Sequence, residues 1–418
     1  MGHLAAKDYY RKLGKKIDGL TMRVPWNDTL YAILKELYSH EEAEVVAKMP
    51  YGLSTLDQII QATHYDKTKL QSILDGLCAK GLVMDIWFGG KYHYAVSPMI
   101  VGVFEFTMMR TKGELNTKEW ARLFHEYLGG NDIFHANFGK GQKVSPLRAL
   151  PHEETLAESE YVEILDYEKA SAIIDQSKNF SIGICSCRHE KLHAGVKTCD
   201  IPLETCSTFG NAAEYMVKYG FGKAVTKSEM FDNIARSKEM GLVLCADNVK
   251  KDISFICHCC GCCCNVLLGI SKFGYPNTVV TSNYIANSDK DICTECGTCA
   301  ETCPIKAISM TPNGNPEVDE AICLGCGVCG LKCPSGAMKL KKRQQKVLHP
   351  EDTFQRVILQ SLERGTLQNL LFSDTQRTSH KFLRTFVGAF LKVPPVKKAL
   401  IGDKFRSSFL EFMQKGAR

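Results

Sequence analysis

The chain has 418 residues, 44% of them hydrophobic, and a formal net charge of +6, which is the composition of a protein with several globular domains. Its twenty cysteines would indicate a disulfide scaffold in a short secreted protein, but the first residues, MGHLAAKDYYRKLGKKIDGL, contain no apolar export segment. No apolar run approaches the roughly 18 residues that a membrane-spanning helix needs. We therefore expect a cytoplasmic protein in which the cysteines serve metal or redox chemistry.

The N-terminal part is predicted to be an extension over residues 1–27 and a winged-helix domain over residues 28–96. A capping box of Ser39 and Glu42 opens a second helix that Pro50 ends, and Ser54 is expected to cap a short third helix. Apolar residues on one face predict a first helix with Leu30, Ile33, Leu34 and Leu37 and a fourth helix with Leu70, Ile73, Leu74 and Leu77. A β-hairpin follows. Its first strand alternates at Leu82, Met84, Ile86 and Phe88, its turn is Gly89-Gly90, and its second strand alternates at Tyr92, Tyr94 and Val96.

A winged helix raises the hypothesis of DNA binding. The candidate recognition helix, residues 66–80, carries Lys67, Lys69 and Lys80, but Asp66 and Asp75 offset them. This is far less basic than a surface that neutralises many phosphates. Winged helices also serve as protein-docking modules, so we favour docking and keep DNA binding as the alternative.

The middle of the chain is predicted to contain a helical connecting region over residues 97–180 and a cysteine-rich α/β domain over residues 181–283. Pro146 and Pro151 mark an expected loop, and residues 165–174 (LDYEKASAII) an expected helix before a strand, SIGI. A further cysteine-containing domain over residues 284–340 and a helical tail over residues 341–418 complete an α+β multidomain fold.

Residues 284–340 contain an internal repeat. The segment CTECGTCAETCPIKAISM recurs 30 residues later as CLGCGVCGLKCPSGAMKL, so that a C-x-x-C-x-x-C-x-x-x-C-P pattern occurs twice. Glycines at 297 and 327 allow the backbone to pass close to a bound group. The alternative interpretation is a pair of zinc sites or unliganded thiols, which this double spacing rarely indicates.

This repeat resembles the bacterial ferredoxin domain with two [4Fe–4S] clusters, closely and over roughly 55 residues. In that family the fourth cysteine of each run binds the other cluster. The resemblance implies that Cys293, Cys296, Cys299 and Cys333 hold the first cluster. It also implies that Cys323, Cys326, Cys329 and Cys303 hold the second.

A second set of cysteines lies upstream, and neighbouring thiols in it project in different directions, so only a subset can bind one cluster. Its members are Cys185, Cys187, Cys199, Cys206, Cys257, Cys259, Cys260, Cys262, Cys263 and Cys264. Three interpretations stay open: a third iron–sulfur centre, which we favour; catalytic or sensing thiols that form a disulfide; and zinc or a purely structural role. His189 and His258 are further candidate ligands, whereas Cys78 and Cys245 are expected to be core residues of helices.

The pattern CxCR…C…C…CxCCxCCC before a two-cluster repeat loosely resembles a group of bacterial and archaeal multicluster 4Fe–4S proteins. This resemblance implies electron transfer and names no substrate. We expect the protein to act under anaerobic conditions.

The tail, residues 341–418, contains 16 Lys/Arg and 6 Asp/Glu. Amphipathic helices are expected over residues 354–371 and 381–391, with Pro394-Pro395 separating a last short helix. The second helix carries an apolar stripe with basic flanks: Phe382, Phe386, Val387, Phe390 and Leu391 beside Lys381, Arg384 and Lys392. We expect this stripe to pack on its own domain or on a partner subunit, and a peripheral contact with an anionic membrane is the alternative.

The sequence therefore predicts an iron–sulfur electron-transfer protein that passes single electrons through two clusters and a third centre to a partner oxidoreductase. No dinucleotide-binding, P-loop or hydrolase motif identifies a small-molecule substrate, so an electron carrier or oxidoreductase subunit is favoured over a stand-alone enzyme. Two alternatives remain: a redox-responsive winged-helix DNA-binding regulator, and an iron–sulfur oxidoreductase with chemistry at the cysteine site of residues 185–264.

Overall fold

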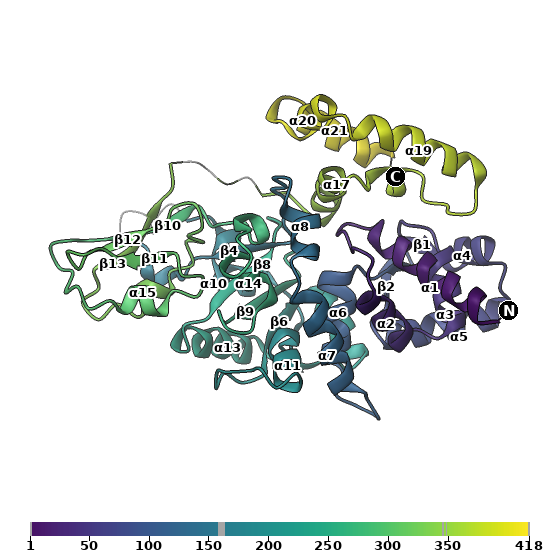
Figure 1. Cartoon of the computed structure of the whole chain (residues 1–418). Helices are drawn as coiled ribbons and strands as arrows, with labels where there is room; N and C mark the ends of the chain where they lie inside the picture. Colours follow the sequence, from purple (N-terminus) through teal and green to yellow (C-terminus); the bar gives the residue numbers. More distant parts are fainter. Residues whose placement is uncertain (1, 158–163, 345–346, 348, 417–418) are drawn as a thin grey trace. The chain divides into compact units, whose positions relative to one another are not determined.

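The computed structural model describes residues 2–157, 164–344, 347 and 349–416 and shows a mixed α/β protein (Figure 1). The chain divides into two compact units. The first comprises Met1–Thr107, Arg122–Val144 and Phe354–Arg418, and the second comprises Met108–Ala121 and Ser145–Thr353. In the described part of the chain, no helix is both long and apolar enough to span a bilayer.

The first unit begins with helices and a small sheet: α1 (Gly2–Asp18), α2 (Asp28–Leu37), α3 (His40–Lys48), β1 (Ser54–Thr55), α4 (Leu56–Thr63), α5 (Lys67–Ala79), β2 (Val83–Phe88) and β3 (Lys91–Val96). The capping box of Ser39 and Glu42 is present at the start of α3. The cap predicted at Ser54 is wrong by one residue: Ser54 belongs to β1, and Thr55 caps α4 through a reciprocal bond with Gln58. Leu13 and Ile17 of α1 are fully buried, so this helix is part of the unit's core.

The hairpin of β2 and β3 turns at Gly89-Gly90, where both glycines have positive φ, as the sequence predicts. The predicted alternation fails toward its tip. Trp87 and Phe88 are 60% and 68% exposed, and Ile86 is exposed as well. Val83 at the start of β2 and Val96 at the end of β3 are buried, whereas the residues next to the turn are exposed, so burial is confined to the base of the hairpin.

The first unit also contains η1 (Met99–Val103), α8 (Asp132–Phe138) and the tail helices α17 (Thr353–Arg364), α18 (Leu367–Leu371), α19 (Thr378–Leu391), α20 (Pro394–Ile401) and α21 (Asp403–Gly416). Helices α6 (Phe104–Met109) and α7 (Thr117–Leu128) cross the boundaries between the two units. The single helix expected over residues 354–371 is two, because Gly365 adopts a left-handed φ of +69° between them. Pro394 begins α20 instead of only separating helices, since proline is compatible with a first helical turn.

The second unit is organised around one antiparallel sheet with the strand order β4-β8-β9-β6-β5-β7 among the described residues. Its strands are β4 (Leu147–Leu150), β5 (Phe180–Ile184), β6 (Glu204–Phe209), β7 (Gly222–Val225), β8 (Val243–Asp247) and β9 (Phe255–Cys259). The segment between Pro146 and Pro151 was expected to be a loop but is the buried strand β4. The two prolines flank the strand without removing a hydrogen bond from its interior.

Successive side chains of these strands point to opposite faces of the sheet. One face packs against α10 (Ala170–Gln176) and α13 (Lys227–Glu239) through residues such as Leu244 and Ile256. The other face presents Val243, Cys245 and Cys259 to a core that includes α14 (Asn265–Ser271) and the cysteine repeat. The sequence placed Cys245 in a helix. It is buried as expected, but it lies in strand β8.

The remaining elements of the second unit are η2 (Glu153–Thr155), η3 (Asp166–Glu168), α11 (Ser186–His193), α12 (Gly210–Lys218), η4 (Pro276–Thr278), β10 (Tyr284–Ser288), α15 (Thr298–Thr302), β11 (Ile308–Met310), β12 (Pro316–Val318), α16 (Val328–Leu331) and β13 (Met338–Lys342). In Figure 1 the cysteine repeat, from β10 to β13, extends to one side of the sheet in green. The strands β10 and β13, which bracket this repeat, pair antiparallel.

Candidate metal centres

Each copy of the cysteine repeat folds as a loop with three cysteines followed by a short helix and the fourth cysteine. Gly297 precedes α15 and Gly327 precedes α16, with φ of +76° and +83°. These left-handed conformations favour glycine and turn each loop sharply into its helix. The two copies therefore present their cysteines in the same local geometry.

A cavity lies beside the first loop, and its lining includes Cys293, Cys296, Cys299 and Cys333. Burial raises the pKa of Cys299, and charge on Cys333 and Cys293 raises it further. Cys296 is exposed, so the cavity reaches the protein surface. The fourth cysteine of the second copy thus lies with three cysteines of the first.

The other four cysteines of the repeat, Cys303, Cys323, Cys326 and Cys329, form a more buried group. Cys303, Cys323 and Cys329 are each less than 8% exposed. Burial raises the pKa of Cys326 well above its ordinary value, with further contributions from charge on Cys329, Cys303 and Cys323. These four thiols therefore form a second group, separate from the cavity.

The residues around these groups fit an anionic cluster with inorganic sulfide. The backbone N–H of Ala307 donates to Sγ of Cys303 at 3.2 Å, and the guanidinium of Arg343 donates to the carbonyl of Cys323. A Cβ on Gly325 would overlap the carbonyl of Tyr284. Donors to sulfur and close backbone approach are what such clusters require.

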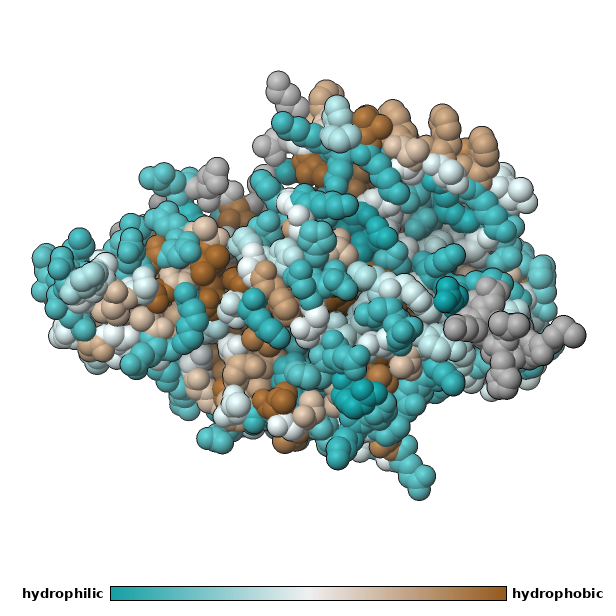
Figure 2. Space-filling view, in the orientation of Figure 1, coloured by the Kyte–Doolittle hydropathy of each residue, from teal (hydrophilic) through white to brown (hydrophobic). Residues whose placement is uncertain are grey.

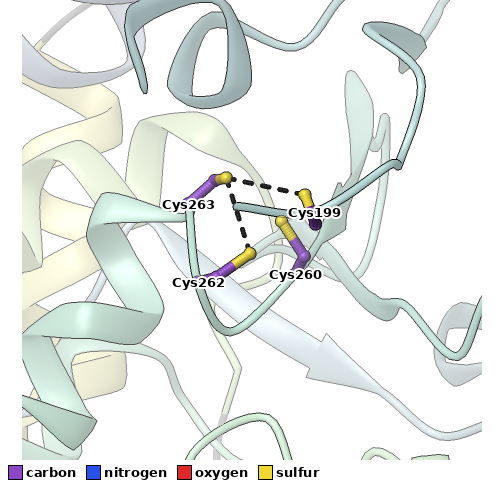
Figure 3. A group of neighbouring side chains, drawn as sticks. All are labelled: Cys199, Cys260, Cys262 and Cys263. Carbon is purple, nitrogen blue, oxygen red and sulfur yellow. Dashed lines mark hydrogen bonds between the residues drawn. The ribbon is translucent and has the colours of Figure 1, made fainter. Parts of the chain in front are cut away.

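Four of the upstream cysteines gather tightly (Figure 3). The sulfur atoms of Cys199, Cys260, Cys262 and Cys263 all lie within 4.8 Å of one another. Sγ of Cys263 is 3.7 Å from Sγ of Cys199 and 3.5 Å from Sγ of Cys262. Cys199 comes from the loop after α11, and the other three come from the turn between β9 and α14. This set is called the turn group below.

The remaining upstream cysteines lie on the cysteine face of the sheet and beside it. Cys245 of β8 pairs with Cys257 of β9, and the register of Ser207 with Ile256 places Cys206 beside Cys257 on the other flank. The pKa of Cys264 is lowered to about 6 by hydrogen bonds with Cys187 and Cys259. Cys185 lies against Cys187. This set, Cys185, Cys187, Cys206, Cys257, Cys259 and Cys264, is called the sheet group below.

Arg188 lies between the two groups and is fully buried. Its Nη1 is 3.8 Å from Sγ of Cys260 and donates to the carbonyl of His258 at 2.9 Å. Burial alone would lower the pKa of Arg188, but charge on Cys185 and Cys260 raises it. Its Nε has no hydrogen-bond partner among the described residues. In the sequence, this arginine is distinguished only by its place in the CxCR motif, and no local signal assigns it to both thiol groups.

Neither candidate histidine faces the thiols. His258 belongs to β9, where alternation turns it to the face opposite Cys257 and Cys259, and its ring nitrogens contact Ser207 and Ser237 at 2.8 and 2.6 Å. His189 contacts the carbonyl of Met108 and the ring of His193. Both rings are satisfied by these hydrogen bonds.

The upstream region adjoins the cysteine repeat directly. Gly261, at the centre of the turn group, lies so close to the backbone of Pro304 that a Cβ there would overlap the Pro304 carbonyl oxygen. Pro304 follows Cys303, which belongs with Cys323, Cys326 and Cys329 to the more buried set of repeat thiols. This set is called the buried cluster group below. The cysteine face of the sheet shares one hydrophobic core with the repeat, including Cys259, Cys264, Cys303 and Cys323.

Comparison with protein families identifies the repeat. Residues 292–337 match the model described as a 4Fe-4S dicluster domain. No curated protein and no solved structure matches the chain. The chain therefore carries a dicluster domain that binds [4Fe–4S] clusters, and the upstream cysteines lie outside the matched residues.

Proposed function

We propose that the protein relays single electrons through two [4Fe–4S] clusters and a third iron–sulfur centre to a partner oxidoreductase. When bound, [4Fe–4S] clusters accept and release one electron at a time. The observation that carries the proposal is the shared core, in which the cysteine face of the sheet continues into the dicluster domain.

For the dicluster domain we assign Cys293, Cys296, Cys299 and Cys333 to one cluster and Cys323, Cys326, Cys329 and Cys303 to the other. The cavity lined by the first four and the mutual electrostatic influence within each group support this assignment. Cys296 is exposed, so its side of the cavity offers a partner protein the shortest approach to a cluster.

We place the third centre at the sheet group. Cys257, Cys259 and Cys264 bring thiols from a strand and a helix start to the core shared with the dicluster domain. Hydrogen bonds with Cys206 and Cys259 lower the pKa of Cys257, which favours the thiolate that a metal binds. The contact of Gly261 with Pro304 makes this region adjacent to the buried cluster group.

Anaerobic purification followed by iron and sulfide quantitation tests this proposal. We expect about twelve irons per chain in clusters, four for each of three cubes. About eight would remove the third centre and leave the dicluster domain. A colourless oxygen-free preparation without broad visible absorbance would remove the electron-transfer function itself.

We further propose that residues 28–96 are a winged-helix-like domain that docks a protein partner. Lys69 and Lys80 of the candidate recognition region form ion pairs with Glu41 and Glu42 of α3, which leaves little charge for phosphate contacts. The hairpin tip exposes Trp87 and Phe88, side-chain types that are enriched at protein interfaces. DNA binding is the competing function.

A gel shift at low salt separates these two functions. We expect no shift of a DNA duplex by reduced or by air-exposed protein. A salt-dependent shift that changes with the redox state would instead establish the regulator, and a Trp87→Ser variant would then leave it unchanged.

For the tail we propose a peripheral contact with an anionic membrane. Phe382, Phe386 and Phe390 of α19 are between 58% and 71% exposed, whereas Leu391 is buried, so only part of the predicted stripe packs inside its unit. Figure 2 shows apolar side chains projecting at the edge where Figure 1 places α19 to α21. Exposed aromatic side chains in a basic segment suit an anionic lipid surface.

Sedimentation with vesicles tests the membrane contact. We expect binding to vesicles that contain phosphatidylserine and a large loss of binding in a Phe382→Ser, Phe386→Ser variant. Equal binding of both proteins, or none by the unaltered protein, would contradict the proposal.

A further inference from the structure

From the sequence we predicted one centre formed by a subset of the ten upstream cysteines. The structure instead divides these cysteines into the turn group and the sheet group. Cys260 and Cys263 belong to a small core with Leu242, against which Cys199 packs. Cys259 and Cys264, each next in sequence to one of these residues, belong to the core shared with the dicluster domain. Thiols in and beside the turn between β9 and α14 therefore point into two different cores.

The distances within the turn group match the requirements of a single ion. A tetrahedral ion with metal–sulfur bonds of about 2.3 Å places its four sulfur ligands about 3.8 Å apart. The sulfur atom of Cys263 is 3.7 Å from that of Cys199 and 3.5 Å from that of Cys262. No large rearrangement is needed for these atoms to share one ion.

Cysteines that bind a cube are arranged differently, because each binds a separate iron and they surround the whole cluster. The dicluster domain provides the comparison within the same chain. Its eight cysteines bind [4Fe–4S] clusters, and none of its groups gathers as tightly. Among the described residues, the turn group is the only set of three or more ligand side chains whose donor atoms lie within 4.8 Å of one another.

The surroundings of the turn group suit four thiolates. Arg188 is fully buried and places Nη1 3.8 Å from Sγ of Cys260, where it offsets negative charge. Lys197 donates to the carbonyl of Cys199 and holds the loop that supplies this ligand. Cys263 is buried and Cys262 is exposed, so an ion can enter from solvent. In metalloproteins, contacts from residues that surround the metal ligands hold those ligands in the orientation that binding requires.

We propose that Cys199, Cys260, Cys262 and Cys263 bind a single tetrahedral metal ion of the zinc class, separate from every iron–sulfur cluster of the protein. Four protein ligands leave no open position, which is the arrangement of structural sites. The ion ties the loop of Cys199 to the turn that contains Cys259, Gly261 and Cys264. It thereby positions the sheet group and the contact with Pro304.

Metal analysis of the full-length protein, purified without oxygen, tests this inference. We expect about one zinc per chain in addition to the cluster iron. A Cys199→Ser, Cys263→Ser variant is expected to lose the zinc and to keep the eight irons of the dicluster domain and their visible absorbance. The matched control, Cys257→Ser, Cys264→Ser, alters the sheet group and is expected to keep the zinc. Zinc content therefore tests the single-ion site, and iron content above eight tests the proposed third centre.

A conservative variant covers the case in which the serine variant does not fold. Histidine replaces cysteine in Cys₃His zinc sites, so Cys199→His is expected to fold and to retain one zinc. Replacement of the ion with Co²⁺ is expected to produce the absorption bands of a tetrahedral thiolate site. One iron in place of one zinc supports the single-ion geometry. Absence of a single metal ion from the unaltered protein, zinc retained by the Cys199→Ser, Cys263→Ser variant, or a disulfide without metal overturns it.

Discussion

The dicluster domain and the upstream region both concentrate cysteines, but they assemble their thiols in opposite ways. In the dicluster domain each run of four cysteines spans eleven residues, and one local loop determines where three of the four point. In the upstream region the thiols come from helix starts, sheet strands and a loop after α11. Local spacing is therefore enough to predict the ligands in the dicluster domain. In the upstream region, strand register and the packing of distant segments decide which thiols meet.

The strongest test of this comparison addresses the exchange of the fourth cysteine between copies. If Cys299 and Cys333 bind one cluster, a Cys299→Ser, Cys333→Ser variant is expected to lose about four irons. If Cys303 belongs to the other cluster, a Cys299→Ser, Cys303→Ser variant is expected to lose about eight. Iron quantitation on oxygen-free protein distinguishes the two variants.

Each of these variants removes two thiols of the dicluster domain, so each serves as the control for the other. Should the outcome be reversed, with about eight irons lost from the first variant and four from the second, each run of four cysteines would bind its own cluster. The local loop would then determine all four ligands.

A smaller effect is expected at the junction of the two regions. Gly261→Ala forces a Cβ onto the carbonyl of Pro304, and overpacking of this kind costs about 1–3 kcal/mol of stability. The turn group and the buried cluster group should then move apart, which slows electron equilibration between the dicluster domain and the sheet group. Unfolding by urea and the rate of cluster reduction after rapid mixing measure the two consequences.

Gly52→Ala is the matched control for this substitution, because a Cβ at Gly52 meets only one atom at ordinary contact distance and the residue lacks a positive φ. Unchanged stability of Gly261→Ala relative to Gly52→Ala would show that the turn relaxes away from Pro304. The close approach would then have no part in joining the regions.

The difference between the two regions also explains what the sequence could and could not predict. The dicluster domain was predicted from an internal repeat that resembles two-cluster ferredoxins, and the family model confirms a 4Fe-4S dicluster domain over residues 292–337. The division of the upstream cysteines was missed because it depends on register: Cys257 and Cys259 share a face of β9, while His258 between them faces α13. The apolar run around Cys245 is equally compatible with a helix, and only its pairing with Cys257 makes it a neighbour of the thiols.

Similar limits apply to the first unit. The capping box at Ser39 and the turn at Gly89-Gly90 are local signals, and both were predicted correctly. The exposure of Ile86 and Phe88 depends on how much of the hairpin packs on the core, and the burial pattern shows that only its base does. An alternation pattern contains no such information. The boundaries of the proposed domains stay predictions.

The smallest expected effect is a difference between the two regions in how their stability depends on pH. His349 is 6% exposed and packs near the sheet, with Nδ1 2.8 Å from Oδ1 of Asn248. Burial, aided by the charges of Arg148 and Lys250, lowers its pKa to about 3. Because the unfolded state binds a proton near pH 6.5 and the folded state does not, the stability contributed by this neutral histidine is complete above pH 6.5 and is lost as pH falls toward 3. Between pH 7.5 and 5.5 the loss is about 1.4 kcal/mol.

Hydrogen exchange of β8 and β9 at these two pH values measures the effect, with His349→Gln as the comparison. The unaltered protein should lose about 1.4 kcal/mol more protection than the variant over this interval, since other buried histidines contribute equally to both. Residues 292–337 contain no histidine, so the protection of the dicluster domain should change equally in the two proteins. A variant that loses as much protection in β8 and β9 as the unaltered protein would show that His349 is already protonated at pH 7.5 or is solvated in the folded state. In that case the acid sensitivity of the sheet region would come from other buried groups, such as His258 of β9, whose pKa burial lowers to about 3, and not from His349.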